Sequence, residues 1–217
     1  IGTNPRYEAT ILNSRIRKAY IANNVDIFSI GDVGELTYPY TSLDNSTKTI
    51  NDIINNTHKL SEIINKSQKP MFIIGQSIFK LNSAPYILEE LKKYLTINNK
   101  INNDWNSLNI LSNNASTVGS YDLEILSSKN GKNITLDGIK NNEFDVIFLF
   151  GQENLKFKKN NEFIIYVGSH GDRGADMAEI ILPGAAYTEQ DGYFTNLEGK
   201  IQKAYKASHP PGDAKED

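Results

Sequence analysis

Hydrophobic residues along this chain gather into short, nearly continuous runs. Three of them end in glycine, and a fourth follows the third closely; the runs are Val25–Gly31, Lys69–Gly75, Phe144–Gly151 and Glu162–Ser169. They lack the strict alternation of a half-exposed strand, and such runs are typical of strands covered on both faces in a parallel sheet. The pattern therefore predicts four buried parallel strands.

Segments with apolar residues at helical spacing separate these runs. The predicted helices begin at capping residues or at proline and lie over Pro5–Asn23, Thr47–Lys66 and Ser83–Leu95. Asn4 is the expected N-cap of the first and Ser83 of the last. Alternating strands and helices predict a layered α/β fold with a mostly parallel sheet. Ser127–Asn133 reads as a loop, no domain boundary is evident, and we expect one domain over residues 1–217.

Composition narrows the classes of function. The chain has 217 residues, of which 39% are hydrophobic, and a formal net charge of -3. This charge argues against nucleic-acid binding, which needs a basic surface. The longest apolar run, Val146–Phe150, is far shorter than the roughly 20 residues of a membrane span. The chain has no cysteine, which excludes disulfides, thiolate zinc sites and cysteine-bound iron–sulfur clusters within it.

The loop Gly168–Gly174 is the first candidate for chemistry. Glycines directly after a strand can let backbone N–H groups approach a phosphate. Its spacing is G-x-x-G-x-x-G rather than the dinucleotide G-x-G-x-x-G, so a tight strand exit is the alternative. His170, beside Asp172, could act as a general base, although no nucleophile motif accompanies it. His58 and His209 lack the spacing of metal ligands.

Carboxylates and basic residues elsewhere are expected to serve structure. Glu189, Asp191 and Glu198 could form an acid–base pair, but they accompany Asp-Gly and Glu-Gly steps that are typical of turns. Asn196 and Glu198 are expected to hold a turn, with Gly199 in a backbone conformation that other residues avoid. The basic cluster Arg15, Arg17 and Lys18 is interpreted as a solvated helix face.

Several collinear motifs carry a resemblance to a known family. The stretch from Gly168 to Gln202 contains "ILPGAAYTE", an aromatic–Thr–Asn step and "EGKIQ", and it resembles a signature of the molybdopterin oxidoreductase superfamily. The further motifs "GTNPRYEA", "NSRIRKA" and "PPGDAKED" resemble one branch, the large iron–sulfur subunits of respiratory complex I. One departure is Lys200, where the family usually has arginine.

The resemblance implies a molybdopterin-oxidoreductase fold without its cofactor. It implies no catalytic residue, no metal ligand and no bound cofactor in this chain, with iron–sulfur clusters and FMN elsewhere in the complex. The cleft that binds pterin in catalytic relatives would survive only as a vestige, and its candidate residues here are Gly2, Asn4, Gly168, His170, Gly171 and Gly174.

The resemblance also implies partners and a location. The expected partners are the cluster-bearing N-terminal half and other subunits of the peripheral arm, with no nucleic acid and no membrane span. The expected location is the matrix side of the mitochondrial inner membrane, possibly with mitochondrial encoding. The chain would then be a piece of a longer or split subunit. Two alternatives stay open: a fragment of a molybdenum enzyme of the formate dehydrogenase type, and a free-standing nucleotide-binding domain.

Overall fold

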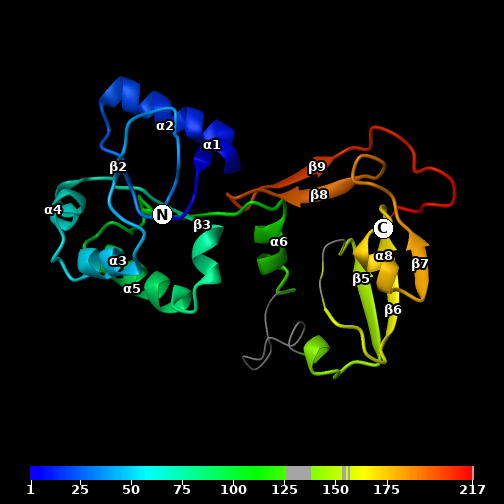
Figure 1. The fold of residues 1–217 in the computed structure, drawn as a ribbon. Helices are drawn as coiled ribbons and strands as arrows, with labels where there is room; N and C mark the ends of the chain where they lie inside the picture. Colours follow the sequence, from blue (N-terminus) through cyan, green and yellow to red (C-terminus); the bar gives the residue numbers. More distant parts are fainter. Residues whose placement is uncertain (126–137, 153–154, 156, 217) are drawn as a thin grey trace. The chain divides into compact units, whose positions relative to one another are not determined.

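A computed structural model describes residues 1–125, 138–152, 155 and 157–216 (Figure 1). The chain divides into two compact units, which we call unit 1 (Ile1–Asn114) and unit 2 (Ala115–Asp217). Both combine helices with parallel strands, so the predicted α/β class is confirmed. One domain over residues 1–217 stays a prediction, because compactness alone does not settle whether either unit folds by itself. The expected loop Ser127–Asn133 lies outside the described residues.

Unit 1 alternates helices with short strands. In chain order its elements are α1 (Pro5–Glu8), α2 (Thr10–Asn23), β1 (Phe28–Ser29), β2 (Thr41–Ser42), α3 (Thr47–Ile54), α4 (Lys59–Lys66), β3 (Phe72–Gly75), the 3-10 helix η1 (Gln76–Lys80), α5 (Ala84–Ile97) and β4 (Leu108–Leu111). Strands predicted at Val25–Gly31 and Lys69–Gly75 are confirmed as β1 and β3. β1 is shorter than predicted, and only two of its residues pair with β2.

The strands of unit 1 form two parallel pairs. β1 pairs with β2 in the register Phe28↔Thr41, and β3 pairs with β4 in the register Phe72↔Leu108. Figure 1 shows α2 on one side of these strands and α3 and α5 on the other. The core lies between the strands and helices α3 and α5, where Ile53, Ile74 and Leu91 are almost completely buried.

Local backbone chemistry divides two of the predicted helices. Pro5–Asn23 breaks at Ala9, whose ψ of 73° is not helical, and Tyr7 and Ile11 of the expected apolar stripe are exposed. Thr47–Lys66 breaks between Ile54 and Lys59, where Asn56 has a φ of 57°. His58 then caps α4, because its Nδ1 accepts a hydrogen bond of 3.1 Å from the N–H of Leu60. Ser83 precedes α5 as predicted, but its side chain makes no capping bond within the described structure.

Unit 2 combines a three-stranded parallel sheet with an antiparallel hairpin. Its elements are α6 (Thr117–Asp122), β5 (Val146–Phe150), β6 (Phe163–Gly168), α8 (Arg173–Met177), β7 (Ile180–Pro183), β8 (Gly192–Thr195) and β9 (Ile201–Ala204). The sheet order is β5-β6-β7, with both pairs parallel. The strands predicted at Phe144–Gly151 and Glu162–Ser169 are confirmed as β5 and β6.

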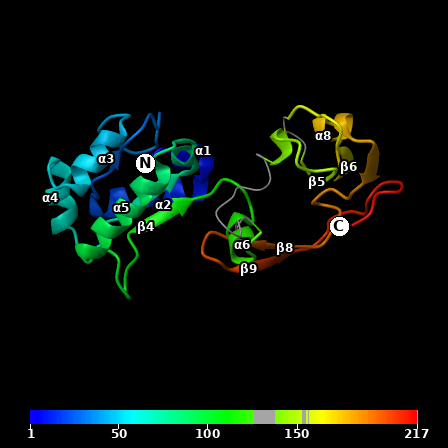
Figure 2. The same ribbon diagram turned by 90° about the horizontal axis from the view of Figure 1, so that it is seen from below.

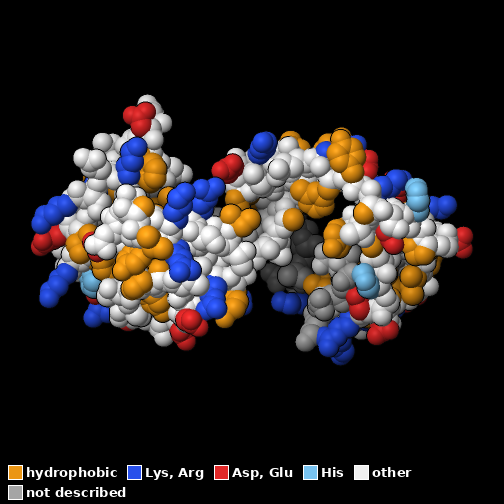
Figure 3. All heavy atoms as spheres, turned by 90° about the horizontal axis from the view of Figure 1, so that it is seen from above, with side chains coloured by type: hydrophobic (Ala, Val, Ile, Leu, Met, Phe, Trp, Pro, Cys, Tyr) orange, Lys and Arg blue, Asp and Glu red, His pale blue; other side chains and the backbone are white. Residues whose placement is uncertain are grey.

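Within the described residues of unit 2, β5 and β6 are buried on one face of the sheet only, and β7 is exposed along its length. Ile147 and Leu149 of β5 are buried with Ile164 and Tyr166 of β6, and Ala175 of α8 packs against them. The opposite face exposes β5 side chains, including Phe148 and Phe150, whose stacked rings lie 6.2 Å apart. The prediction that both faces are covered is therefore wrong for β5 within unit 2. Hydrophobic side chains lie at the surface of both units in Figure 3.

The hairpin closes unit 2 with α6 beside it. β8 and β9 pair from Gly192↔Ala204 to Thr195↔Ile201, and Figures 1 and 2 both show α6 next to β8. The Oγ of Ser116 accepts a hydrogen bond of 3.1 Å from the N–H of Thr195. Only glycine fits at position 119, because a Cβ there would lie 2.6 Å from the hydroxyl oxygen of Thr195.

Candidate functional site

The candidates Gly2 and Asn4 lie in unit 1, where the strands end. The N–H of Gly2 donates to the carbonyl oxygen of Ile30, and the N–H of Gly75 donates to that of Ile1, both at 2.9 Å. A Cβ on Gly75 would collide with the carbonyl oxygen of Gly2. The glycines here thus allow main-chain segments to approach one another closely.

Asn4 begins α1, and its hydrogen-bonding groups are already engaged. Its Oδ1 accepts from the N–H of Arg6 at 2.9 Å, and its Nδ2 donates to the carbonyl oxygen of Val33. Its own N–H donates at 2.9 Å to a carboxylate oxygen of Glu8. The other carboxylate oxygen of Glu8 accepts from the hydroxyl of buried Thr3 at 2.8 Å.

Glu8 therefore supplies the negative charge at this turn. Backbone N–H groups at a helix start favour an anion, and here the anion is a side chain of the same turn. A phosphate at this position would meet the carboxylate of Glu8 and be repelled by it.

In unit 2, Gly168 and Gly174 of the glycine loop surround the side chain of Tyr166. This tyrosine is only 1% exposed. A Cβ on Gly168 would collide with its hydroxyl group, and a Cβ on Gly174 would lie 2.7 Å from its ring and 2.7 Å from the carbonyl oxygen of Gln152. Both glycines are thus required by the packing of Tyr166 and the adjacent main chain. The space beside each glycine is filled by these atoms.

His170 and Gly171 form the exposed tip of this loop. The carbonyl oxygen of His170 accepts a hydrogen bond of 2.9 Å from the hydroxyl of Tyr166, so the residue helps to hold the loop through its main chain. Its ring Nδ1 lies 2.9 Å from the Oγ of Ser169. Gly171 has open space where a Cβ would be. Asp172 begins α8 as its N-cap residue, without a side-chain capping bond to the described residues.

Carboxylates of the following stretch make turn contacts, as predicted. Glu189 accepts from the N–H of Ala186 at 3.0 Å. Asp191 accepts from the N–H of Lys206 at 2.9 Å and pairs with the ammonium of Lys203 at 3.0 Å. The Lys206 N–H, and next the Lys203 ammonium, lower the pKa of Asp191 below its ordinary value. Both contacts of Asp191 thus hold the chain at the ends of the β8–β9 hairpin.

The hairpin turn matches its predicted role at Asn196 and Gly199, but not at the side chain of Glu198. Oδ1 of Asn196 accepts from the N–H groups of Glu198 at 3.0 Å and Lys200 at 2.9 Å. Gly199 has a φ of +79°, a left-handed conformation that favours glycine. Glu198 contributes its main chain to this turn, and its side chain is exposed.

Metal and membrane sites are not found in the part of the chain that the structure describes. Those residues contain no group of three or more His, Asp or Glu side chains able to hold a metal. No helix among them is long and apolar enough to span a bilayer. The two side chains that fill the strand ends, Glu8 and Tyr166, were not predicted from the sequence. The spacing of Glu8 from Asn4 could have indicated a helix-start contact, whereas nothing local marks Tyr166.

Comparison with known proteins places these features in a family. The molybdopterin oxidoreductase family matches residues 1–217. The chain is 38% identical over 220 residues to the NADH-ubiquinone oxidoreductase 75 kDa subunit of Reclinomonas americana, covering all of this chain and 31% of that protein. It is 38% identical over 218 residues to a subunit of the NADH-quinone oxidoreductase of Rickettsia bellii, with the same coverage of 100% and 31%.

A third relative is more distant but covers the same region. The mitochondrial NADH-ubiquinone oxidoreductase 78 kDa subunit of Candida albicans is 33% identical over 220 residues, which are all of this chain and 29% of that protein. The chain thus spans about three tenths of the length of these curated relatives. Since the family match extends over every residue, the chain belongs to the molybdopterin oxidoreductase family.

Proposed function

We propose that this chain is a cofactor-free scaffold in the large iron–sulfur subunit of NADH:quinone oxidoreductase, respiratory complex I. It supports the peripheral arm of an assembly that transfers electrons from NADH to quinone. The observation that carries the proposal is 38% identity, along the whole chain, to proteins named as subunits of this oxidoreductase. Because the chain has no cysteine, cysteine-bound clusters belong to other polypeptide.

The absence of a pterin cofactor is part of this proposal. A pterin nucleotide needs room and unengaged donors at the strand ends, and Glu8 and Tyr166 fill these positions in units 1 and 2. The residues present therefore do not fit a bound pterin phosphate. No residue of this chain is proposed as catalytic, and the former cleft residues Gly168, His170 and Gly174 serve the packing of Tyr166 and its loop.

Partners and location follow from the relatives. Two of the relatives bear the names of ubiquinone oxidoreductase subunits, and one of these is named as mitochondrial. We expect this chain at the matrix side of the mitochondrial inner membrane. Its expected partners are the cluster-bearing region and neighbouring subunits of the peripheral arm.

The test separates assembly from electron transfer. Gly199→Val forces a β-branched residue into a left-handed conformation, at a cost of roughly 1–2 kcal/mol or more. The expected result is less assembled complex on native gels, with unchanged NADH:ferricyanide activity per flavin. The matched control is Gly171→Val, where the backbone is unstrained and the space is open. Normal abundance with lost activity per flavin would overturn the scaffold role.

Elemental analysis tests the cofactor independently. The purified complex is expected to contain iron and flavin without molybdenum or tungsten. Stoichiometric molybdenum, with the fluorescence of an oxidised pterin after extraction, would instead indicate an enzyme of the formate dehydrogenase type.

A further inference from the structure

Helix α2 of unit 1 buries little of its surface. Its one fully buried residue is polar: Asn13, whose Nδ2 donates to the hydroxyl oxygen of Thr37 at 2.9 Å. Helices α3, α4 and α5 instead bury apolar side chains, such as Leu60 and Ile64 of α4. Helix α2 is thus held in unit 1 without the complete burial of any of its isoleucines.

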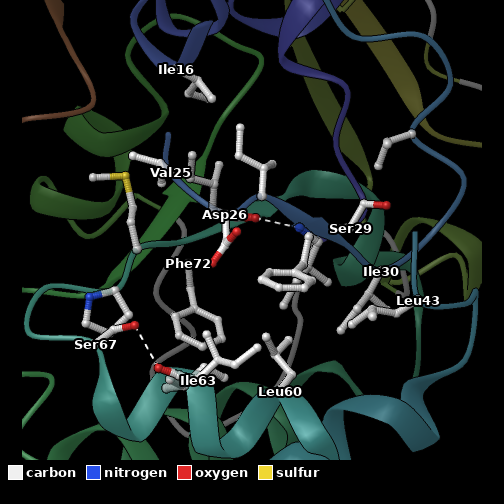
Figure 4. Close-up of a pocket in the computed structure, with 18 of the residues that line it drawn as sticks. Ile16, Val25, Asp26, Ser29, Ile30, Leu43, Leu60, Ile63, Ser67 and Phe72 are labelled. Atoms are coloured by element: carbon white, nitrogen blue, oxygen red, sulfur yellow. Dashed lines mark hydrogen bonds between the residues drawn. The ribbon is translucent and has the colours of Figure 1, made fainter. Parts of the chain in front are cut away.

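The inner side of α2 lies over an apolar groove between the two pairs of strands. The walls of this groove are Val25–Ser29, which ends in β1, and Lys69–Ile73, which runs into β3, and its volume is about 480 Å³. Ile16 of α2 lines the groove, opposite helix α4 (Figure 4). Ile1 closes one end, where its amino group donates to the carbonyl oxygen of Ile73 at 2.7 Å. The inner side of α2 therefore faces other apolar residues of unit 1.

The outer side of α2 mixes apolar and basic residues. Ile11 and Ile21 are 77% and 70% exposed, and Arg15 and Lys18, also exposed, lie between them in the sequence. Successive members of this set are three or four residues apart, so they are neighbours on one side of the helix. We call Ile11, Arg15, Lys18 and Ile21 the outer face of α2. Its two exposed isoleucines depart from the polar face that is usual for a surface helix.

The cations of α2 have no carboxylates beside them. The helix contains Arg15, Arg17 and Lys18 and no Asp or Glu, although the chain has a formal net charge of -3. None of the three makes an ion pair or a side-chain hydrogen bond with the residues that the structure describes. In α5, by contrast, Lys93 pairs with Glu89 at 2.9 Å. The outer face thus carries positive charge that unit 1 does not balance.

We propose that the outer face of α2 docks against an acidic surface of another polypeptide in the complex. Carboxylates of that partner pair with Arg15 and Lys18, and apolar side chains beside them cover Ile11 and Ile21. Arginine suits this role because its guanidinium can bind a carboxylate through two parallel hydrogen bonds. The apolar contacts exclude water around these pairs. The inference rests on the proposed function, since it supplies the chemistry of a partner for the scaffold.

The order of residues along the outer face favours a protein partner over anionic lipid. A helix that lies on a membrane separates its apolar residues from its basic ones. Here Arg15 and Lys18 lie between Ile11 and Ile21, so insertion of both isoleucines would carry the cations toward the hydrocarbon. A protein surface can instead place a carboxylate opposite each cation.

Lysine labelling compares the outer face in the assembled complex and in the 217-residue chain alone. Acetic anhydride acetylates exposed amines, and mass spectrometry gives the rate at each lysine. The internal references are Lys59 and Lys92, which are exposed on α4 and α5. Relative to them, Lys18 is expected to react roughly tenfold more slowly in the complex than in the chain alone, because the partner excludes the reagent. A third sample adds vesicles with about 30% phosphatidylserine to the chain.

The labelling has two outcomes that would overturn the proposal. One is equal reactivity of Lys18 in the complex and in the chain, whether its amine is open in both or covered by the chain itself. The other is protection of Lys18 by the vesicles as strong as in the complex, which would identify a membrane surface as the occupant.

Charge reversal tests the pairing itself. Arg15→Glu with Lys18→Glu is expected to lower the amount of assembled complex on native gels at least about tenfold, because carboxylates would then face carboxylates. The matched control, Arg15→Lys with Lys18→Arg, keeps both charges and should assemble nearly normally. Both variants of the free chain should keep their Tm within about 2 °C, since surface substitutions have small effects. If the charge-reversed chain melts earlier, the labelling of the unsubstituted protein decides.

Normal abundance of the charge-reversed complex would refute docking at this face. It would leave the scaffold role intact, which the comparison of Gly199→Val with Gly171→Val tests separately. An equal loss in the charge-reversed and charge-conserving variants would also refute the proposal, because positive charge would then not be what the partner recognises.

Discussion

The two units expose apolar surface in different places. In unit 1 the opening lies in the plane of the strands, between β1 and β3, while helices cover both faces. In unit 2 the three strands pair without a gap, and among the described residues it is one face of β5 that is open, with Phe148 and Phe150 at the surface.

This difference sets what each surface can accept. The opening of unit 1 is an apolar groove between β1 and β3, and it presents main-chain groups together with apolar side chains. The open face of unit 2 presents side chains whose backbone groups are already paired, so any apolar layer could cover it.

The units also fill their strand ends differently. Unit 1 places a carboxylate, Glu8, at the start of a helix. Unit 2 places an aromatic ring, Tyr166, against two glycines. The first excludes an anion by charge and the second by volume, so substitutions at the two places should have different consequences.

The largest expected effect tests the one-sided cover of the sheet in unit 2. Leu149 and Phe148 are adjacent in β5 but are 3% and 55% exposed. Leu149→Ala should lower the free energy of unfolding by about 2–5 kcal/mol, because it leaves a cavity. Phe148→Ala should lower it by under about 1 kcal/mol. Urea titration of the 217-residue chain measures both, and equal losses would mean that both faces are covered.

The glycine loop gives the next effect. Gly174→Ala places a methyl group against Tyr166 and the main chain of Gln152, and overpacking of this kind costs about 1–3 kcal/mol. Gly171→Ala, three residues earlier, meets nothing within 4 Å and should be nearly neutral. Thermal melting compares the two, with hydrogen exchange of β6 locating the loss. A neutral Gly174→Ala would show that Tyr166 does not fill this space tightly.

The smallest effect concerns the closed end of the groove in unit 1. For a polypeptide with a free amino group at Ile1, the folded pKa of about 6 lies below the ordinary 8.0. Between these values the unfolded chain binds more protons, so stability is present above pH 8 and is lost as the pH falls toward 6. The change is on the order of 1 kcal/mol after allowance for partial exposure.

Urea unfolding at pH 6 and pH 8 checks this sign. The control is the same chain acetylated at Ile1, in which the amino group can no longer bind a proton and every other ionisable group is kept. The difference between the two proteins should appear only within that range of pH. An identical pH dependence would show that the amino group is well solvated.

Much of the local structure follows from the residues themselves. Continuous apolar runs located β1, β3, β5 and β6, as expected of strands in parallel pairs, although β5 is buried on one face only. The Asn196–Gly199 turn was predictable because it depends on local residues: a short polar side chain accepts hydrogen bonds from nearby N–H groups, and a glycine adopts the left-handed conformation. Asn4 capped its helix for the same reason, and the family motifs indicated the fold.

Only the tertiary structure decided which segments meet. The run Val146–Phe150 is continuous in sequence but alternately buried, since coverage depends on what packs on each face. Tyr166 lies at a strand end because its ring packs beside Gly174 and the main chain of Gln152, whereas the contact of Glu8 with Asn4, four residues away, is local. The groove between β1 and β3 depends on bonds from Ile1 to Ile73, 72 residues apart. Hydrophobic pattern and turn chemistry act over a few residues, whereas pairing and packing join residues that are distant in the sequence.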